Sequence, residues 1–397
     1  MSETGSLLTK LECRACCSEF DPAGIVGTCP TCGHALLAVY DLRRLDLRRW
    51  RDQVSTRARS LWRYRELLPV GRVESIATLG EGGSSILPLT PVAGAPEVDI
   101  VVKDDGGLPT GSFKARGMAV AVSRARELGL QDLFVPSAGN AGVALAAYSA
   151  RAGLRARIYL PERTPSAMQI ACTAYGAEVT EVPGTIREAG EEARRAEKER
   201  GSFDMSTLRE PYRVEGKKTM GLEIFEETYP DRFPDAIVYP TGGGTGLVGM
   251  AKAFSELRTL GALDHVPRLY AVQPRGCAPV VRALADGAAK VTPWPEPSTI
   301  APGLLVPAPF ASERVLEAVR VTRGGGVTVT DREIVEAMRM LARHHGVSAS
   351  PEGAATYAAL PRLLGERAIR AGERVLLYNT GTGIGFSADE LARQVLD

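Results

Sequence analysis

The stretch Leu108-Pro109-Thr110-Gly111-Ser112-Phe113-Lys114-Ala115-Arg116-Gly117 decides the fold that we expect. It follows a β-branched run and a polar turn, and apolar residues recur beyond it at three- and four-residue steps. This pattern predicts a helix with Ser112 as its N-cap. Lys114 would then lie in the first turn, where the positive end of the helix dipole opposes a protonated ammonium. A partly neutral lysine is a nucleophile for carbonyl carbon, although a lysine taken alone is most often a surface charge.

Three further glycine-rich stretches each follow an apolar strand-like run and open a helix. They are Pro136-Ser137-Ala138-Gly139-Asn140-Ala141-Gly142, Pro240-Thr241-Gly242-Gly243-Gly244-Thr245-Gly246 and Tyr378-Asn379-Thr380-Gly381-Thr382-Gly383. Open α/β sheets bind ligands beyond the carboxyl ends of parallel strands, which is where these stretches would lie. They predict one ligand site built from several strand ends.

Together with Lys114, these stretches resemble the pyridoxal-phosphate enzymes of fold type II. Tyr212-Arg213-Val214-Glu215-Gly216-Lys217-Lys218-Thr219 is most similar to threonine synthases, and the resemblance extends from about Leu61 to the C-terminus. It implies a homodimeric carbon–oxygen lyase that converts O-phospho-L-homoserine and water to L-threonine and phosphate by γ-elimination and β-hydration. A paralogue acting on another phosphorylated amino acid, or a threonine or serine dehydratase, would use the same scaffold. Leu108, Ala115 and the segment 84–86 depart from the family pattern, so these alternatives stay open.

The resemblance also assigns residues to the cofactor. Lys114 would bind pyridoxal phosphate covalently and act as the catalytic base, Asn140 would bond its phenolic oxygen, and Thr380 would face its ring nitrogen. The phosphate would be held by Gly242, Gly243, Gly244, Thr245 and Gly246. Glycines before a helix leave backbone N–H groups free to surround an anion, which supports this assignment from the residues themselves. Asn140 is equally a candidate helix N-cap.

The glycine loop and the segment near Arg213 each resemble another phosphate-binding motif in part. Residues 244–249 also fit a dinucleotide fingerprint, but Gln273 rather than an acidic residue ends the next strand. A Walker motif fails because Pro211 stands where its first glycine is required. Neither motif is therefore expected here.

The substrate implied by the resemblance carries a phosphate and a carboxylate. Arg213, whose planar fork suits a phosphate, matches the family arginine for that group, and Ser137 matches a second phosphate-contacting position. Ser84 and Ser85, in the glycine-rich loop 79–85, fall beside the expected substrate carboxylate. Lys217 and Lys218 are interpreted as ordinary surface charges of a helix.

Five of the seven cysteines lie between Cys13 and Cys32. Two Cys-x-x-Cys knuckles, Cys13 with Cys16 and Cys29 with Cys32, predict a closed four-thiolate zinc site with a structural role. Cys17 and His34 are possible alternates that such a site does not need. A zinc ribbon that binds nucleic acid or a protein partner, on a degenerate enzyme body, is the non-enzymatic alternative.

Composition and charge narrow the function further. The 397 residues carry 48 Lys and Arg against 47 Asp and Glu, so no net field favours nucleic acid or an anionic membrane. Nine arginines between positions 41 and 66 are interpreted as the solvated face of an amphipathic helix that ends before Pro69. The stretch 1–10 has no apolar core for a signal peptide and no later run is long enough for a membrane span, so a cytoplasmic protein is expected.

Strand-like and helical patterns alternate after Lys114, which predicts an α/β fold of fold type II. We expect two open, twisted, mainly parallel sheets with helices on both faces, preceded by a small zinc ribbon. The expected domains are the ribbon at 1–40, an arginine-rich helical linker at 41–72, a large domain from 73–114 and 210–397, and a small domain at 115–209. The small domain would be inserted into the large one.

Overall fold

The computed structural model describes residues 5–90, 97–137, 139–386, 388 and 391–393. Residues 1–4 of the stretch 1–10, and Ala138 in the first of the three further glycine-rich stretches, lie outside this described part. The chain forms two compact units. Unit 1 combines Met1–Gly83 with Lys114–Thr219, and unit 2 combines Ser84–Phe113 with Met220–Asp397. The four domain bounds expected from the sequence stay a prediction.

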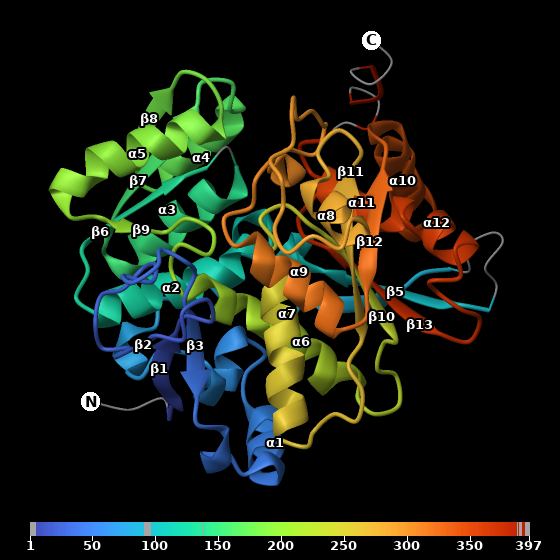
Figure 1. The fold of residues 1–397 in the computed structure, drawn as a ribbon, viewed down its shortest axis with the longest axis horizontal. Helices are drawn as coiled ribbons and strands as arrows, with labels where there is room; N and C mark the ends of the chain where they lie inside the picture. Colours follow the sequence, from blue (N-terminus) through green and yellow to red (C-terminus); the bar gives the residue numbers. More distant parts are fainter. Residues whose placement is uncertain (1–4, 91–96, 138, 387, 389–390, 394–397) are drawn as a thin grey trace. The chain divides into compact units, whose positions relative to one another are not determined.

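Unit 1 contains two sheets (Figure 1). The first is antiparallel and has the order β2-β1-β3, from β1 (Leu8–Glu12), β2 (Glu19–Phe20) and β3 (Leu37–Tyr40). The second is parallel and has the order β8-β7-β6-β9, from β6 (Asp132–Pro136), β7 (Arg155–Pro161), β8 (Glu178–Val182) and β9 (Phe203–Asp204). Its helices are α1 (Leu47–Thr56), α2 (Lys114–Glu127), α3 (Asn140–Ala152), α4 (Ser166–Ala174) and α5 (Ile186–Arg200). Helix α6 (Arg213–Thr228) begins in unit 1 and ends in unit 2.

Helices cover both faces of the parallel sheet of unit 1. Phe134 and Tyr159 pack with Ala189 and Ala193 of α5. Ile158, the neighbour of Tyr159 on β7, points to the opposite face because side chains alternate along a strand. There it contacts α3 so closely that a methyl group on Gly142 would lie 2.9 Å from Ile158 Cγ2.

Unit 2 is built on one six-stranded sheet with the order β12-β11-β10-β13-β5-β4. All neighbours are parallel except β4, which pairs antiparallel with β5 at the edge. The strands are β4 (Ser85–Pro88), β5 (Asp99–Asp104), β10 (Ala236–Pro240), β11 (Arg268–Pro274), β12 (Gly325–Val329) and β13 (Arg374–Asn379). The helices are α7 (Thr245–Thr259), α8 (Pro279–Ala285), α9 (Ser312–Val321), α10 (Asp331–His345), α11 (Pro351–Ala358) and α12 (Leu360–Gly365).

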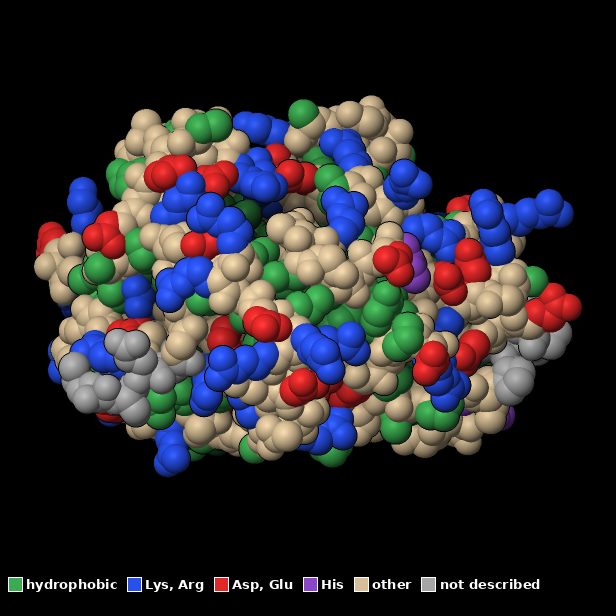
Figure 2. Space-filling model, turned by 90° about the horizontal axis from the view of Figure 1, so that it is seen from below, with side chains coloured by type: hydrophobic (Ala, Val, Ile, Leu, Met, Phe, Trp, Pro, Cys, Tyr) green, Lys and Arg blue, Asp and Glu red, His purple; other side chains and the backbone are tan. Residues whose placement is uncertain are grey.

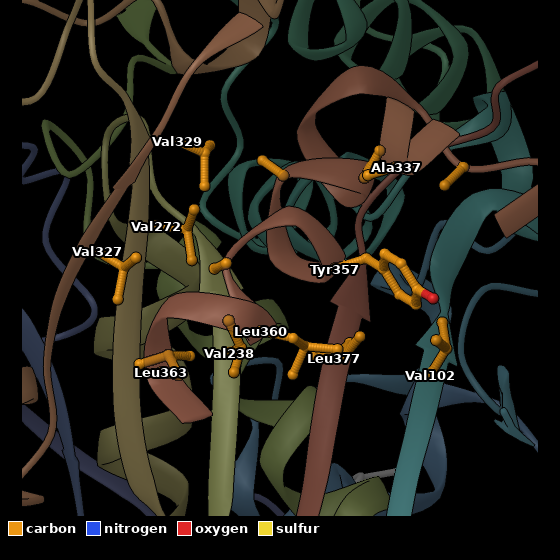
Figure 3. Packing of buried hydrophobic residues seen from close by; sticks show 14 of the residues in the cluster. Val102, Val238, Val272, Val327, Val329, Ala337, Tyr357, Leu360, Leu363 and Leu377 are labelled. Atoms are coloured by element: carbon orange, nitrogen blue, oxygen red, sulfur yellow. The ribbon is translucent and has the colours of Figure 1, made fainter. Parts of the chain in front are cut away.

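The main core of unit 2 lies on one face of this sheet. Figure 3 shows Val238, Val272 and Leu377 of three strands facing Tyr357 of α11 and Leu360 of α12. The adjacent residue Tyr239 points to the other face, where its hydroxyl occupies the space beside Gly246 of α7. Both faces are therefore covered, which confirms the predicted α/β class with mainly parallel sheets.

Three local predictions are wrong. Ser112 is not the N-cap of α2, because the helix begins at Lys114 and Ser112 lies one residue too far upstream. Asn140 is not an N-cap either: Gly139 takes that position and Asn140 is the first residue of α3. Lys217 and Lys218 are not surface charges but are fully buried on α6, where Lys218 Nζ lies 2.7 Å from a carboxylate oxygen of Glu215.

The arginine-rich segment differs from the single helix that we expected. Helix α1 ends at Thr56, and a 3-10 helix follows at Leu61–Leu67. Arg63 Nε donates to the carbonyl of Val54 at 3.1 Å, and Arg57 pairs with Glu66 at 2.6 Å. These arginines satisfy the end of α1 and fold the next turn back onto it, so the periodic stripe does not continue as one helix.

No helix in the described part of the chain combines the length and apolarity needed to cross a lipid bilayer. On the face drawn in Figure 2, Lys and Arg side chains alternate with Asp and Glu. Charges of mixed sign on this face fit the near-zero net charge.

Candidate active site and metal centre

The four predicted zinc ligands come together in unit 1. The sulfur atoms of Cys13, Cys16, Cys29 and Cys32 all lie within 4.8 Å of one another, and all four cysteines are free of disulfides. Cys13 Sγ is 3.4 Å from Cys32 Sγ, and Cys16 Sγ is 3.6 Å from Cys29 Sγ. A tetrahedral zinc with bonds of about 2.3 Å separates its sulfurs by roughly 3.7 Å, so the donor set fits that ion.

The two cysteine knuckles are built in the same way. Cys17 N donates to Cys13 O and Gly33 N donates to Cys29 O, each at 2.8 Å. The tight turns direct both thiolates of each knuckle inward. Cys17 is outside the cluster and exposed, and the ring of His34 pairs with the Cys32 carbonyl at 3.1 Å. Neither alternate is therefore a ligand in this arrangement.

In unit 2 the chain that leads into Lys114 is tied to the Thr380 motif. Phe113 N donates to Thr380 O at 2.9 Å, and Thr382 N donates to Gly111 O at 2.9 Å. Thr110 within this turn has φ +60, a left-handed conformation that β-branched residues rarely adopt and that marks functional sites. Lys114 follows Phe113 directly and is the first residue of α2, in agreement with its predicted place in the first helical turn.

The order of the sheet brings the predicted strand ends of unit 2 together. Strand β13 lies between β10 and β5, all three parallel, so their carboxyl ends share one edge. The glycine loop follows β10, Thr380 follows β13, and the stretch toward Lys114 follows β5. The ring of Phe113 packs edge-on against Tyr239 at the end of β10, with centroids 6.3 Å apart.

Neighbouring atoms of the protein leave no room for side chains at two glycines of the loop after β10. A methyl group on Gly242 would lie 2.3 Å from Gly303 O, and one on Gly244 would lie 2.2 Å from Val315 Cγ2. Gly244 is also the N-cap of α7 and has φ +77. The first N–H groups of α7 have no partner within the helix and carry the positive end of its dipole, so the loop fits a phosphate.

Gln273 supports this loop, a role that the sequence did not reveal. Its fully buried amide donates to Thr241 O at 3.0 Å and accepts from Val280 N at 2.8 Å. The residue that argued against a dinucleotide fold therefore joins the base of the loop to α8. A strand-end glutamine gives no sequence signal for such a bridge.

In unit 1, Ser137 and Asn140 lie at the junction of β6 and α3. Ser137 is buried, and its Oγ accepts from Gly142 N at 3.1 Å, so its hydroxyl helps to satisfy the start of α3. Asn140, at the first position of the helix, is half-buried. Both positions are compatible with their predicted roles, which stay predictions.

Arg213 is a buried cation with spare hydrogen-bonding capacity. It is 2% exposed at the start of α6, and one of its terminal nitrogens donates to Met205 O at 2.5 Å. Its buried Nε has no hydrogen-bond partner among the described residues. A buried donor without a partner is costly, and an anion would supply one.

Glu210 faces the same helix start. Its carboxylate accepts from Tyr212 N at 2.7 Å and from Arg213 N at 3.0 Å. Burial raises the pKa of Glu210 to about 7, outweighing Arg213 and the backbone amides, which lower it. Sequence reasoning missed this carboxylate because nothing in its neighbourhood marks it as buried.

A family model identifies the class of enzyme to which the chain belongs. Residues 77–381 match the family model described as pyridoxal-phosphate dependent enzyme, so the chain belongs to that family and is an enzyme. The predicted cofactor and the predicted fold type are thereby confirmed.

Named relatives make the match more specific. The chain is 33% identical to a threonine synthase of Methanocaldococcus jannaschii over 94% of this chain and 92% of that protein. It is also 33% identical to a threonine synthase of Methanosarcina acetivorans, with 94% and 91% covered. The predicted resemblance to threonine synthases is confirmed.

Solved structures support the fold alone. Maize serine racemase superimposes with a TM-score of 0.66 at 21% identity, covering 79% of this chain and 91% of that one. A likeness at this identity carries no information on the substrate.

Proposed function

We propose that this enzyme is a threonine synthase that converts O-phospho-L-homoserine and water to L-threonine and phosphate. The observation that carries the proposal is the 33% identity to a threonine synthase over nearly the whole of both chains. Buried Arg213, with Nε unpartnered among the described residues, supports a substrate that bears a phosphate. A threonine synthase needs such a phosphate site, and a dehydratase acting on threonine does not.

In this proposal the bound pyridoxal phosphate withdraws electrons from the carbons of the substrate next to its amine. Lys114 would hold the cofactor covalently. Once the amine of the substrate had replaced it there, the freed Nζ of Lys114 would accept the proton from the α-carbon of the substrate. The cofactor phosphate would be bound by the backbone amides of Gly242, Gly243 and Gly244 in the loop and of Thr245 and Gly246 at the start of α7. Asn140 would donate to the phenolic oxygen, and Thr380 would offer a hydroxyl, rather than a carboxylate, to the ring nitrogen.

The chain's remaining site residues hold the substrate. Arg213 and Ser137 bind the phosphate that leaves when the bond between the γ-carbon and oxygen breaks, and Ser84 and Ser85 hold the carboxylate. A proton also leaves the β-carbon when the phosphate departs. Water then supplies the hydroxyl at the β-carbon and a proton to the phosphate, and protons return to the γ- and α-carbons, so that threonine and phosphate balance the substrate and water.

We further propose that the four cysteines hold a structural zinc ion, because four thiolates leave no open coordination position. A cytoplasmic homodimer with the domain bounds expected from the sequence completes the proposal. The zinc ribbon as a nucleic-acid module is disfavoured by the near-zero net charge and by the use of Arg57 and Arg63 inside unit 1.

The test supplies the purified protein with O-phosphohomoserine, O-phosphoserine or threonine and measures threonine, phosphate and 2-oxo acid. We expect threonine and phosphate in equal amounts from O-phosphohomoserine only. Turnover of O-phosphoserine would instead support the paralogue that Ser84, Leu108 and Ala115 leave open. Release of 2-oxo acid from threonine without phosphate would support a dehydratase and reject the proposal.

A further inference from the structure

The glycine-rich loop 79–85 contains a carboxylate that is completely buried. Glu81 is 0% exposed, and its two oxygens accept three hydrogen bonds within unit 1. Trp62 Nε1 donates at 2.8 Å, the Tyr148 hydroxyl at 2.7 Å and Leu79 N at 2.8 Å. A buried charge is tolerated only with such partners, so the loop, the 3-10 helix after α1 and helix α3 are held to one carboxylate.

The backbone on either side of Glu81 is fixed as well. Leu61 N donates to Glu81 O at 2.9 Å. A methyl group on Gly82, which has φ +100, would lie 2.3 Å from Leu61 N. The backbone of the loop therefore lies in direct contact with the backbone at Leu61. This contact fixes the position of the loop within unit 1.

The other end of the loop is held in unit 2 by a buried ammonium. Lys103 is 0% exposed on β5, and its Nζ donates to Ser84 O at 2.7 Å. Glu223 of α6, which is also buried, balances the charge at 3.0 Å. A buried ion pair adds little net stability compared with apolar residues of similar size, so stability alone does not account for it.

We propose that Glu81 and Lys103 are positioning residues that keep the loop 79–85 in one conformation before substrate binds. The loop thereby presents Ser84 to an anionic group of the substrate without first losing conformational freedom. The identity of that substrate rests on the proposed function, whereas the anchoring of the loop does not. In this proposal Leu61 and Trp62 hold the loop and do not bind a nucleic acid.

The experiment uses the full-length holoenzyme with Glu81→Gln, Tyr148→Phe or Lys103→Met. Glutamine offers one carbonyl oxygen, so at least one of the three donors loses its acceptor. We expect KM for O-phosphohomoserine to rise about tenfold or more, with a smaller change in kcat. Amide hydrogen exchange of the peptide that covers residues 79–85 should become faster, and the absorbance of the bound cofactor should stay unchanged.

Two variants serve as matched controls. Glu127 of unit 1 has a carboxylate side chain that is 7% exposed. It accepts from backbone amides outside the loop, of Gly71 at 2.9 Å and of Arg72 at 2.6 Å. Lys252 pairs with Glu256 on α7 at 2.5 Å. Glu127→Gln and Lys252→Met should leave KM and the exchange of the loop peptide unchanged.

The outcomes separate this proposal from the proposed function. Unchanged KM and unchanged loop exchange in folded Glu81→Gln and Lys103→Met proteins would overturn the positioning role. If either protein does not fold, Tyr148→Phe and Trp62→Phe, which each remove a single donor, decide by the same two readouts. A wild-type protein that makes no threonine would refute the proposed function, while loop exchange without substrate would still decide the anchoring.

Discussion

The burial of Arg213 bears on which substrate the enzyme binds. Its guanidinium is buried, and one of its donors is unused within the described part of the chain. If a substrate phosphate binds there, Arg213→Met should lower kcat/KM for O-phosphohomoserine by roughly 10- to 100-fold, the usual effect of a charge-assisted hydrogen bond. Steady-state kinetics would measure it.

Arg124→Lys is the control for Arg213, since Arg124 is also buried in unit 1 and donates to Pro22 O at 2.6 Å. The assignment of Arg213 fails if both variants lose the same fraction of kcat/KM. Cofactor absorbance should stay near the wild-type value in each.

The raised pKa of Glu210 predicts how the stability of the protein depends on pH. Its pKa is about 7 in the folded protein and about 4.5 in the unfolded chain, chiefly because burial disfavours the charge. A raised carboxyl pKa contributes stability below pH 4.5, and this contribution is lost as the pH rises through about 7. The term is on the order of 3 kcal/mol, and Glu210→Gln should remove it.

Urea unfolding at pH 5.5 and 8.5 checks this term. The difference in the free energy of unfolding between the two pH values should be smaller in Glu210→Gln than in the wild type. An identical pH dependence of both proteins would show that Glu210 ionises as freely as in water.

At the scale of the element, the turn from β10 to α7 depends on glycines for steric reasons. Gly244 has φ +77 and a methyl group there would collide with Val315, whereas Gly261, just beyond the other end of α7, has φ +71 and open space around it. Gly261→Ala should therefore cost only the backbone strain, about 1 kcal/mol. Gly244→Ala should lower the free energy of unfolding by clearly more than Gly261→Ala does, and it should weaken cofactor binding.

Thermal unfolding and titration with pyridoxal phosphate would compare the two alanine variants. Equal losses of Tm and unchanged cofactor affinity in both would mean that the loop can shift to accept the methyl group. The turn would then not be the rigid phosphate cradle that we propose.

Elements were predictable from the sequence where one periodicity dominates. The strand at Glu178–Val182 and the helix at Ile186–Arg200 belong to the alternating pattern expected after Lys114, and alternation and a capping box define them locally. The arginine-rich helix predicted from the sequence was longer than the helix in the structure. The contacts of Arg57 and Arg63 that end α1 arise only in the folded chain, so the sequence did not reveal them.

The candidate site was predictable where glycine-rich turns follow strands. Lys114 and Thr380 lie where the motifs predicted them, in the first turn of a helix and just after a parallel strand. The buried charges of Glu81, Lys103 and Lys218 were not predictable, because a charged residue in a sequence is most often exposed.

At the scale of the whole molecule, the zinc ribbon should contribute to folding and not to chemistry. The protein should contain one zinc per chain, and Cys13→Ser or Cys29→Ser should lose it and lower Tm, since metal binding and folding are coupled. Elemental analysis and thermal unfolding would measure both effects. The fraction that remains folded should keep its KM for O-phosphohomoserine.

The rival view of the ribbon is tested with the same variants. Salt-sensitive RNA or DNA binding by the wild type that disappears in Cys13→Ser would make the ribbon a nucleic-acid module. We expect no such binding.

The central claim is that pyridoxal phosphate is bound covalently to Lys114, and borohydride reduction of the holoenzyme followed by peptide mass mapping tests it most directly. We predict that the reduced cofactor is found on the peptide that contains Lys114 and on no other. Its attachment to Lys103, Lys217 or Lys218, or an unmodified Lys114 in a protein that binds the cofactor, would contradict the account.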